Sequence, residues 1–465
     1  MKVIKASNRR TRGIRRTSVR PSASRRSRAR GRGKPRTATV AMRFEEGFGE
    51  GYREGVQAGL HSFATGFEGT SIVIPTYNQL DMLRQCIASI MDNTDLPYEI
   101  IVVDNASSDG TASYLQQLGG QVRYRTLEAN KGFSGAVNVG LMMAKGSTIV
   151  LLNNDTLVAE RWLDNLLACL NSDPRIGMVG PVTNYISGEQ QIEVPYADVR
   201  DMPAFAREFN RSNPALWRRT DRLVGFCVLF RRELIRQIGY FDEGYEIGNF
   251  EDDDFCIRVR MLGRSLVIAQ DTFIHHFGSV SMKALGDRFM LVNDRNQHYF
   301  LDKWLNPYEW IHRILQLTGE SERSGFDMAA LFPSGVAVRG IGATIYWIDG
   351  GVRRPVEGVL SIPIVRLSVV DIQRWPPAEP IAAGEAERRW FATEGPNREP
   401  QGLVRLPGGA IFLIRGRTAR RIISPLALEG WHLHEKPFRE IEPEKLAEFE
   451  EGLPVIAPPK LRQAL

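Results

Sequence analysis

The sequence has few cysteines and no long hydrophobic run. Its four cysteines, at positions 86, 169, 227 and 256, form no CxxC pair, which fits neither a disulfide framework nor a zinc site. The longest apolar runs, such as SIVIP at 71–75 and TIVLL at 148–152, have the length of strands and are too short to span a membrane. We therefore expect a cytoplasmic protein without a transmembrane segment.

Acidic residues are missing from the first forty positions. Residues 1–40 contain fifteen Lys and Arg and no Asp or Glu, while the whole chain has a net charge of +6 and residues 41–465 have a net charge of −9. The segment has too few apolar residues to fold and lacks the apolar stretch of a secretory signal. We predict a disordered basic tail over 1–42. Contact of residues 1–40 with a polyanion, such as nucleic acid or an anionic membrane, and a solvated tail without a partner both fit this composition.

A glycine-rich segment follows over 43–68. Its glycines recur every fourth residue from Gly47 to Gly59, in step with Phe44, Phe48 and Tyr52. This period predicts a helical stripe that another helix could approach closely. A flexible linker is the alternative interpretation.

From residue 69 to 305, short β-branched runs alternate with amphipathic stretches. Strands are predicted at TSIVIP (70–75), YEIIVVDN (98–105), QVRYRTLE (121–128) and TIVLLNND (148–155), with helices at 80–94, 109–119 and 134–146. Strict alternation of strand and helix indicates βαβ units, and hence an α/β fold with a mainly parallel sheet and helices on both faces. Ligands of such sheets bind beyond the carboxyl ends of the strands.

Polar residues follow the predicted strands at that edge. They are Pro75, Thr76, Tyr77 and Asn78 after the first strand, Asp104 and Asn105 after the second, and Asn153, Asn154 and Asp155 after the fourth. Oxygen ligands of this kind suit Mg²⁺ or Mn²⁺ held by one or two carboxylates and substrate phosphates. Taken alone, Asp104 could equally cap the next helix.

Seven segments in order resemble the signatures of glycosyltransferase family 2. They are PTYN (75–78), VVDNASSDGT (102–111), NKGFSGAVNVG (130–140), LLNNDT (151–156), GFCVLFRRELIRQIGYFDEGY (225–245), EDDDFCIRVRMLG (251–263) and HHFGSVS (275–281). The resemblance implies a GT-A fold, which is a Rossmann-like fold of nucleotide-diphospho-sugar transferases. It also implies inverting transfer of a sugar from a nucleoside diphosphate sugar to an acceptor hydroxyl.

The resemblance assigns roles to the strand-end residues. Nucleotide-sugar binding falls to Pro75, Thr76, Tyr77, Asp104, Asn105, Lys131, Gly132, Asn153 and Asn154. Asp155 occupies the last position of the family's DXD element and is expected to bind the divalent cation, Mn²⁺ or Mg²⁺. Because Asn153 replaces the first acid of that element, His275 is predicted to complete the metal site, as in relatives that resemble rhamnosyltransferases.

The acidic cluster Glu251–Asp254 matches the family's ED-x-D pattern. Inverting transfer needs a general base on the acceptor side of the sugar, and the match assigns this role to Asp252, with Glu251 positioning the acceptor or the helix start. Neighbouring negative charge raises the pKa of a carboxylate and makes it a better proton acceptor. Arg258 lies four residues after Asp254 and is expected to pair with it. A negatively charged helix cap is the alternative interpretation of the cluster.

The C-terminal third has no βαβ pattern. After a predicted linker at 306–332, VRGIGATIYWIDGGVRRPV (338–356) resembles VRLPGGAIFLIRGRTARRII (404–423) at a period of 66 residues. We predict a small C-terminal β-rich region of two repeated modules, 333–398 and 399–465. The arginine pairs Arg353/Arg354 and Arg420/Arg421 could bind an anionic glycan or phosphate, or lie solvated on hairpins.

Together these patterns predict a metal-dependent inverting glycosyltransferase with a glycan or protein acceptor, acting in bacterial cell-surface or spore-surface glycan synthesis. Peripheral attachment at a membrane or spore surface is compatible with the basic tail. The competing hypothesis is a catalytically inactive binding or scaffold protein that uses the tail and the β-modules.

Overall fold

The computed structural model describes residues 65–278, 286, 288–319, 326–392 and 399–462. The predictions for the basic tail and for nearly all of the glycine-rich segment therefore lie outside the described residues. From Glu68 onward the described residues form one compact unit. Within them, no helix combines the length and the apolar character that a membrane span requires.

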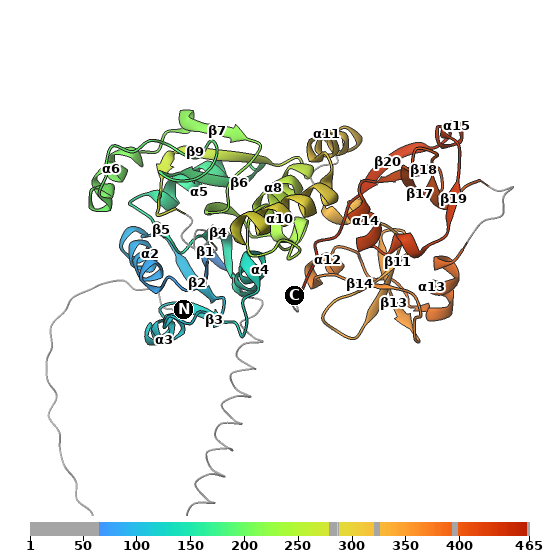
Figure 1. Ribbon diagram of the computed structural model, residues 1–465, viewed down its shortest axis with the longest axis horizontal. Coiled ribbons are helices and arrows are strands. Elements are labelled where there is room, and N and C mark those ends of the chain that lie inside the picture. Colours follow the sequence, from blue (N-terminus) through green and yellow to red (C-terminus); the bar gives the residue numbers. More distant parts are fainter. Residues whose placement is uncertain (1–64, 279–285, 287, 320–325, 393–398, 463–465) are drawn as a thin grey trace, which may run out of the picture. The chain divides into compact units, whose positions relative to one another are not determined.

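An eight-stranded sheet forms the centre of the N-terminal part of this unit (Figure 1). In spatial order its strands are β3 (Arg123–Thr126), β2 (Tyr98–Asp104), β1 (Phe67–Thr76), β4 (Gly146–Leu152), β8 (Cys227–Arg231), β6 (Ile176–Val182), β9 (Ser265–Phe273) and β7 (Trp217–Thr220). The helices along this part of the chain are α2 (Leu80–Asn93), α3 (Thr111–Gln117), α4 (Gly132–Met143), α5 (Trp162–Ser172), α6 (Met202–Phe209), α7 (Glu233–Ile238), α8 (Glu251–Met261) and α10 (Arg288–Trp304).

Both faces of the central part of the sheet are buried, because strands such as β6 and β8 are buried at consecutive positions rather than at alternate ones. In β1, Ile72 and Ile74 pack into one core with side chains of α2 and α5. Val73, between them, packs into the other core with side chains of α4 and α8. Successive side chains of a strand point to opposite faces, so the prediction of an α/β fold with helices on both faces is confirmed.

The sheet is mixed rather than mainly parallel. β1, β2 and β3 are parallel, as the βαβ pattern predicted. β8, in contrast, runs antiparallel to both β4 and β6, and β7 runs antiparallel to β9. β7 and β8 follow the long segment 183–216, which has none of the regular strand–helix alternation that the sequence pattern shows before it, so the parallel prediction did not extend to these strands.

The predicted β-rich C-terminal region is confirmed as two five-stranded sheets, coloured orange and red in Figure 1. The first has the order β14 (Ile364–Arg366), β11 (Val336–Arg339), β12 (Ile345–Asp349), β13 (Val352–Glu357) and β15 (Ile381–Ala382). The second has the order β19 (Phe438–Glu440), β16 (Gly402–Arg405), β17 (Ile411–Arg415), β18 (Thr418–Ile422) and β20 (Glu450–Val455).

The two sheets repeat each other in topology and in register. Val338 pairs with Tyr346 in the first sheet, and Val404 pairs with Phe412, each 66 positions later, in the second. In both sheets the third strand of the meander is joined by a parallel strand from further along the chain. The internal sequence repeat is thus a structural repeat.

The paired arginines of the two sheets are used inside the fold. Arg353 Nη1 donates to the carbonyl oxygen of Ile372 at 2.8 Å, and Arg354 Nε donates to that of Glu379 at 2.8 Å. Arg420 donates to several main-chain carbonyls, including that of Phe332 at 3.0 Å. These contacts favour a structural role for the arginines over the anion-binding and the solvated interpretations.

The segment predicted as a linker, 306–332, contains a helix, α11 (Pro307–Leu317). Asn306 caps it by accepting a hydrogen bond from the main-chain nitrogen of Glu309, and Pro307 occupies its first turn, a position that proline favours. Its apolar face buries Trp310, Ile311 and Ile314, and it packs against α8 and β20. The sequence pattern at this helix resembles a core helix more than a flexible connection.

Candidate active site

The carboxyl ends of the central strands meet at one large cavity. Thr76 at the end of β1 pairs with Asp104 at the end of β2, so these strands end at the same level. The side-chain amide of Asn154, two residues after β4, donates to Thr76 Oγ1 at 2.8 Å. The cavity has a volume of about 1770 Å³, which is larger than a typical small-molecule site.

Most of the residues singled out in the sequence line this cavity, although they come from distant parts of the chain. They are Pro75, Thr76, Tyr77, Asn105, Lys131, Gly132, Asn153, Asn154, Asp155, Glu251 and Asp252. Asp104 and His275 are not among the lining residues. Asp155 and Asp252, which are 97 positions apart, therefore share one cavity.

Asp104 is fully buried below the strand ends. Its Oδ1 accepts a hydrogen bond from the main-chain nitrogen of Ser107 at 2.9 Å, while its Oδ2 has no hydrogen-bond partner. The first contact stabilises the turn after β2, as a cap would. A buried acceptor without a donor is rare, and it would be satisfied by a donor group brought by a ligand or water.

Asn105 holds the loop that precedes α4. Its side-chain Oδ1 accepts a hydrogen bond from the nitrogen of Lys131 at 2.7 Å, and its Nδ2 donates to the oxygen of Gly132 at 3.1 Å. Gly132 has φ of 75°, and a Cβ there would lie 3.3 Å from the main-chain nitrogen of Ile247. A glycine is needed at this position because the backbone takes a left-handed conformation close to another segment.

Asp155 lies beside His276 and not beside His275. The strand β10 (His275–His276) pairs antiparallel with β5 (Thr156–Leu157), which directly follows Asp155. His276 Nε2 is 3.2 Å from Asp155 Oδ1, and both side chains are buried. Neighbouring residues of a strand point in opposite directions, so only one of the two histidines can face the cavity, and the structure places His276 there.

His275 points into a different environment and does not line the cavity, contrary to its predicted place at the metal site, and the histidine beside Asp155 is His276. Its Nδ1 is 2.8 Å from the hydroxyl of Tyr196, and its ring packs at 4.9 Å from that of Phe277. Burial, with a smaller contribution from the nearby His276, lowers the pKa of His275 to about 4. A neutral histidine with an aromatic hydroxyl partner is a structural residue.

The hydrogen bond of His276 Nδ1 leaves its Nε2 facing Asp155. His276 Nδ1 is 2.7 Å from the carbonyl oxygen of Tyr185, which can only accept, so Nδ1 carries a proton. Nε2 has no hydrogen-bond partner. In the neutral ring Nε2 presents a lone pair to the Asp155 carboxylate, and two acceptors at 3.2 Å need a shared proton or a metal ion.

The residues present therefore fit a divalent cation. One carboxylate and one imidazole, with the other imidazole nitrogen fixed by a carbonyl, form a common metal-ligand arrangement. Within the described part of the chain no group of three or more His, Cys, Asp and Glu side chains could hold a metal ion. Two protein ligands are what a site completed by substrate phosphates requires.

The turn before α8 has an unusual backbone conformation. Ile247, Asn249 and Phe250 all have positive φ, at 59°, 82° and 71°, which costs about 1–3 kcal/mol for each non-glycine residue. Asn296 of α10 holds this turn. Its Nδ2 donates to the oxygens of Gly248 at 2.8 Å and Glu246 at 2.9 Å, and its Oδ1 accepts from the nitrogen of Glu246 at 2.8 Å.

The turn at 247–250 places Glu251, Asp252 and Asp253 at the cavity. Asp252 accepts hydrogen bonds from the main-chain nitrogens of Gly225 at 3.0 Å and Asp253 at 2.9 Å. Asp253 forms an ion pair with Arg222. A Cβ at Gly225 would lie 3.3 Å from Asp252 Cβ, so the missing side chain lets the Asp252 carboxylate approach the backbone.

Two acids of the cluster, Glu251 and Asp253, have raised pKa values. Burial and the charge of Asp252 raise the pKa of Glu251 well above its usual value, and Glu251 Oε2 has no hydrogen-bond partner. Burial and the charge of Asp252 raise the pKa of Asp253 to about 6, although Arg222 opposes the shift. Clustered negative charge therefore adds to burial in raising the proton affinity of Glu251 and Asp253.

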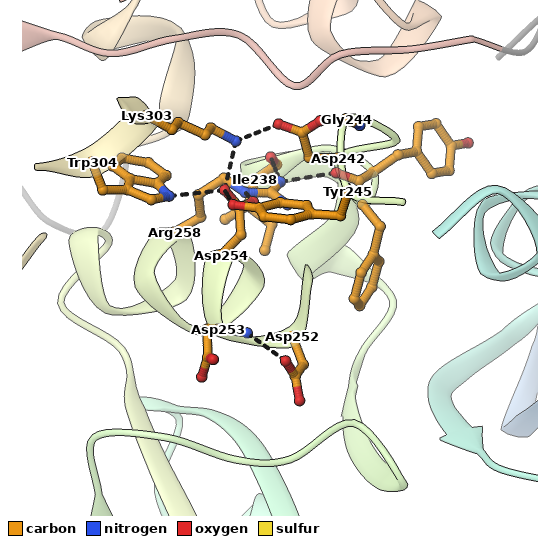
Figure 2. A network of polar contacts seen from close by, with 12 residues as sticks. Ile238, Asp242, Gly244, Tyr245, Asp252, Asp253, Asp254, Arg258, Lys303 and Trp304 are labelled. Atoms are coloured by element: carbon orange, nitrogen blue, oxygen red, sulfur yellow. Dashed lines mark hydrogen bonds and ion pairs between the residues drawn. The ribbon is translucent and has the colours of Figure 1, made fainter. Parts of the chain in front are cut away.

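Asp254 belongs to a buried network on the opposite side of α8 from Asp252 and Asp253 (Figure 2). It accepts hydrogen bonds from Lys303 Nζ at 2.5 Å and Trp304 Nε1 at 2.9 Å. Its other oxygen accepts from Arg258 Nε at 2.9 Å, which confirms the predicted pair. Burial alone would raise the pKa of Asp254, but the charges of Lys303 and Arg258 outweigh burial and lower it.

Lys303 joins this network to a second buried carboxylate. Its Nζ is 2.6 Å from Asp242 Oδ2 (Figure 2), and the side chains of Asp242 and Asp254 are fully buried. The first turn of α8 is thereby fixed to α10. Asn296 and Lys303 were missed in the sequence because single polar residues in an amphipathic helix carry no local signal of long-range contacts.

Comparisons with known proteins show what the chain is similar to. The family model described as Glycosyl transferase family 2 matches residues 71–239. The chain is 28% identical over 279 residues to an N-acetylglucosaminyl-diphospho-decaprenol L-rhamnosyltransferase of Mycobacterium tuberculosis, covering 52% of this chain and 88% of that protein. It is also 28% identical over 230 residues to an uncharacterized protein of Sinorhizobium fredii, covering 46% of this chain and 25% of the relative.

Among solved structures, the chain is similar to a mannosyltransferase from Pyrobaculum calidifontis. The TM-score is 0.35 at 23% identity, and the match covers 45% of this chain and 57% of the other. The chain thus spans about a quarter of the Sinorhizobium relative and little more than half of the Pyrobaculum protein.

Proposed function

Because residues 71–239 belong to glycosyltransferase family 2, we propose that the protein transfers a sugar from a nucleoside diphosphate sugar to an acceptor hydroxyl, with inversion at the anomeric carbon. One observation carries the proposal. A single cavity is lined by Asp155 at the strand ends and by Asp252 at the start of α8, as a displacement with separate leaving-group and acceptor sides requires.

The strand-end residues bind the donor in this proposal. The exposed ring of Tyr77, at 45% exposure, offers a surface for stacking on a nucleobase. Thr76, Asn105 and Asn154 surround the nucleoside, with Asp104 below them accepting a hydrogen bond from it. Lys131 and Gly132, in the loop that Asn105 holds, cover the diphosphate.

Asp155 and His276 hold the divalent cation, Mn²⁺ or Mg²⁺. The cation, when bound, neutralises the charge that develops on the leaving diphosphate. An imidazole ligand favours Mn²⁺ over Mg²⁺. Asn153 is neutral at the first position of the DXD element, where an acid would add a charged metal ligand. His276 contributes the second protein ligand in its place.

Asp252 takes the proton from the acceptor hydroxyl. The raised pKa of Glu251 favours its protonated form, and Arg222 pairs with Asp253. Asp252 is only partly buried and is held by two main-chain N–H groups, which leaves its carboxylate oriented and able to accept a proton. Glu251 lies beside it and positions the acceptor.

The acceptor is a glycan or a protein, and the setting is bacterial cell-surface or spore-surface glycan synthesis in the cytoplasm or peripherally at a membrane. The name of the Mycobacterium relative, a rhamnosyltransferase of a diphospho-decaprenol glycolipid, supports the surface-glycan setting. No finding favours the scaffold alternative.

Donor turnover tests the proposal. The chain is assayed for hydrolysis of a panel of nucleotide sugars with Mn²⁺, alongside Asp252→Asn and Asp155→Asn, with Asp253→Asn as a matched acidic control. We expect Asp252→Asn to lower turnover by about 10²–10⁴-fold with nucleotide binding kept, because general base catalysis is lost. Asp155→Asn should weaken metal-dependent nucleotide binding. Absence of both turnover and nucleotide binding in the unchanged chain would refute the proposal and favour a scaffold.

A further inference from the structure

The segment 457–462, here called the strap, leads from the second β-rich sheet back to the active-site domain. The main-chain nitrogen of Lys460 donates to Asp242 Oδ1 at 3.1 Å, and that of Arg462 donates to Glu243 Oε2 at 2.6 Å. The nitrogen of Glu243 in turn donates to the oxygen of Lys460 at 2.9 Å. The strap is therefore held by main-chain hydrogen bonds to two adjacent acids.

These two acids are buried and connected to the catalytic elements. Asp242 and Glu243 have exposures of 0% and 2%. Asp242 pairs with Lys303, which also contacts Asp254 of α8. Glu243 Oε1 accepts a hydrogen bond from Asn138 Nδ2 of α4 at 3.0 Å. The strap is thus anchored to the same network that fixes the start of α8.

Arg462, on the strap, lines the cavity together with Asp155 and Asp252. Two other arginines that line the cavity have acidic partners, since Arg222 pairs with Asp253 and Arg260 with Asp221. Within the described ranges, no salt bridge involves the Arg462 guanidinium. An arginine at a cavity is suited to bind a ligand anion when its backbone is anchored and its guanidinium makes no salt bridge with a described residue.

We infer that Arg462 binds a phosphate group of a substrate, so that the C-terminal β-rich region contributes a binding residue to the transferase cavity. The inference rests on the proposed function. A guanidinium offers a planar pair of donors that matches phosphate geometry. The phosphate belongs either to the donor diphosphate or to a phosphorylated acceptor, and the two sources are separated by the experiment.

The test uses the full chain with Arg462→Gln, Arg462→Lys and Lys460→Gln. The last variant is the matched control, because Lys460 is a cation on the same strap whose exposed side chain does not line the cavity. Binding of UDP, GDP and dTDP with Mn²⁺ is measured by calorimetry, followed by binding of inorganic phosphate to the nucleotide-saturated protein. Equal thermal unfolding of the glutamine variants establishes that the fold is kept.

We expect Arg462→Gln to weaken one of the two binding reactions by about 10- to 100-fold, since a charge-assisted hydrogen bond is lost. If the variant binds nucleotide more weakly, Arg462 binds the donor diphosphate. If it binds inorganic phosphate more weakly, Arg462 binds the phosphate of an acceptor. Arg462→Lys should fall between the unchanged chain and Arg462→Gln. If Arg462→Gln and Lys460→Gln have equal affinities in both reactions, the inference is overturned and the proposed function stands. If the unchanged chain binds no nucleotide, both the proposed function and the inference are overturned.

Discussion

Replacing Lys303 by methionine tests the buried network that fixes the start of α8. The four charged groups of the network, Asp242, Asp254, Lys303 and Arg258, sum to zero. Without Lys303, Asp254 keeps its ion pair with Arg258 at 2.9 Å. Asp242 keeps only neutral donors, among them Tyr299 and the main-chain nitrogen of Gly244.

We expect Lys303→Met to lower the free energy of unfolding by about 3–5 kcal/mol, which is the usual cost of leaving one partner of a buried ion pair uncompensated. The measurement is equilibrium denaturation followed by tryptophan fluorescence. Lys445→Met is the matched control, since Lys445 makes an exposed ion pair with Glu448 and should cost less than about 1 kcal/mol.

A double variant separates lost charge compensation from lost packing. In Lys303→Met/Asp242→Asn the network is neutral again, because one cation and one carboxylate are both absent. The double variant should therefore be more stable than Lys303→Met. A cost of Lys303→Met within 1 kcal/mol of that of the Lys445 control, or a double variant less stable than the single one, would contradict the assigned role of Lys303.

Three further predictions concern the cavity. Glu251→Gln should stabilise the protein above about pH 4.3, the ordinary Glu pKa. Because the pKa of Glu251 is raised in the folded protein, folding above that pH must take up a proton, and glutamine removes this cost. The gain in unfolding free energy, measured by denaturation, should grow with pH and vanish near pH 4. His276→Ala should weaken Mn²⁺ binding at least about tenfold in calorimetric titration, whereas His275→Ala should not, and the reverse order would contradict the corrected assignment. Asn296→Ala removes the hydrogen bonds to the strained turn and should lower the free energy of unfolding by about 2 kcal/mol. The control Asn293→Ala loses one hydrogen bond of 3.2 Å, from Asn249, and should cost less than about 1 kcal/mol. Equal costs would exclude the role given to Asn296.

Two errors of the sequence interpretation have a common origin. His275 and His276 are adjacent, and the choice between them depends on which side of a two-residue strand faces the cavity. The linker assigned to 306–332 contains α11, whose apolar face packs on α8 and β20. In both cases the deciding contact is made with a residue far away in the chain, so no local pattern reveals it.

The amino-acid sequence by itself determined the α/β class and the repeat of the two β-rich sheets, and most of the site residues predicted from it do line the cavity. It could do so because strand and helix periodicities are local and because the strand-end residues of parallel strands meet at one edge. Only the tertiary structure decided that β8 runs antiparallel to β4 and β6 and that β7 runs antiparallel to β9. It also decided that His276 faces Asp155 and that Lys303 and the strap hold the elements around α8. Those features depend on contacts between residues up to 219 positions apart, and such pairings are selected by burial and charge compensation in the folded chain.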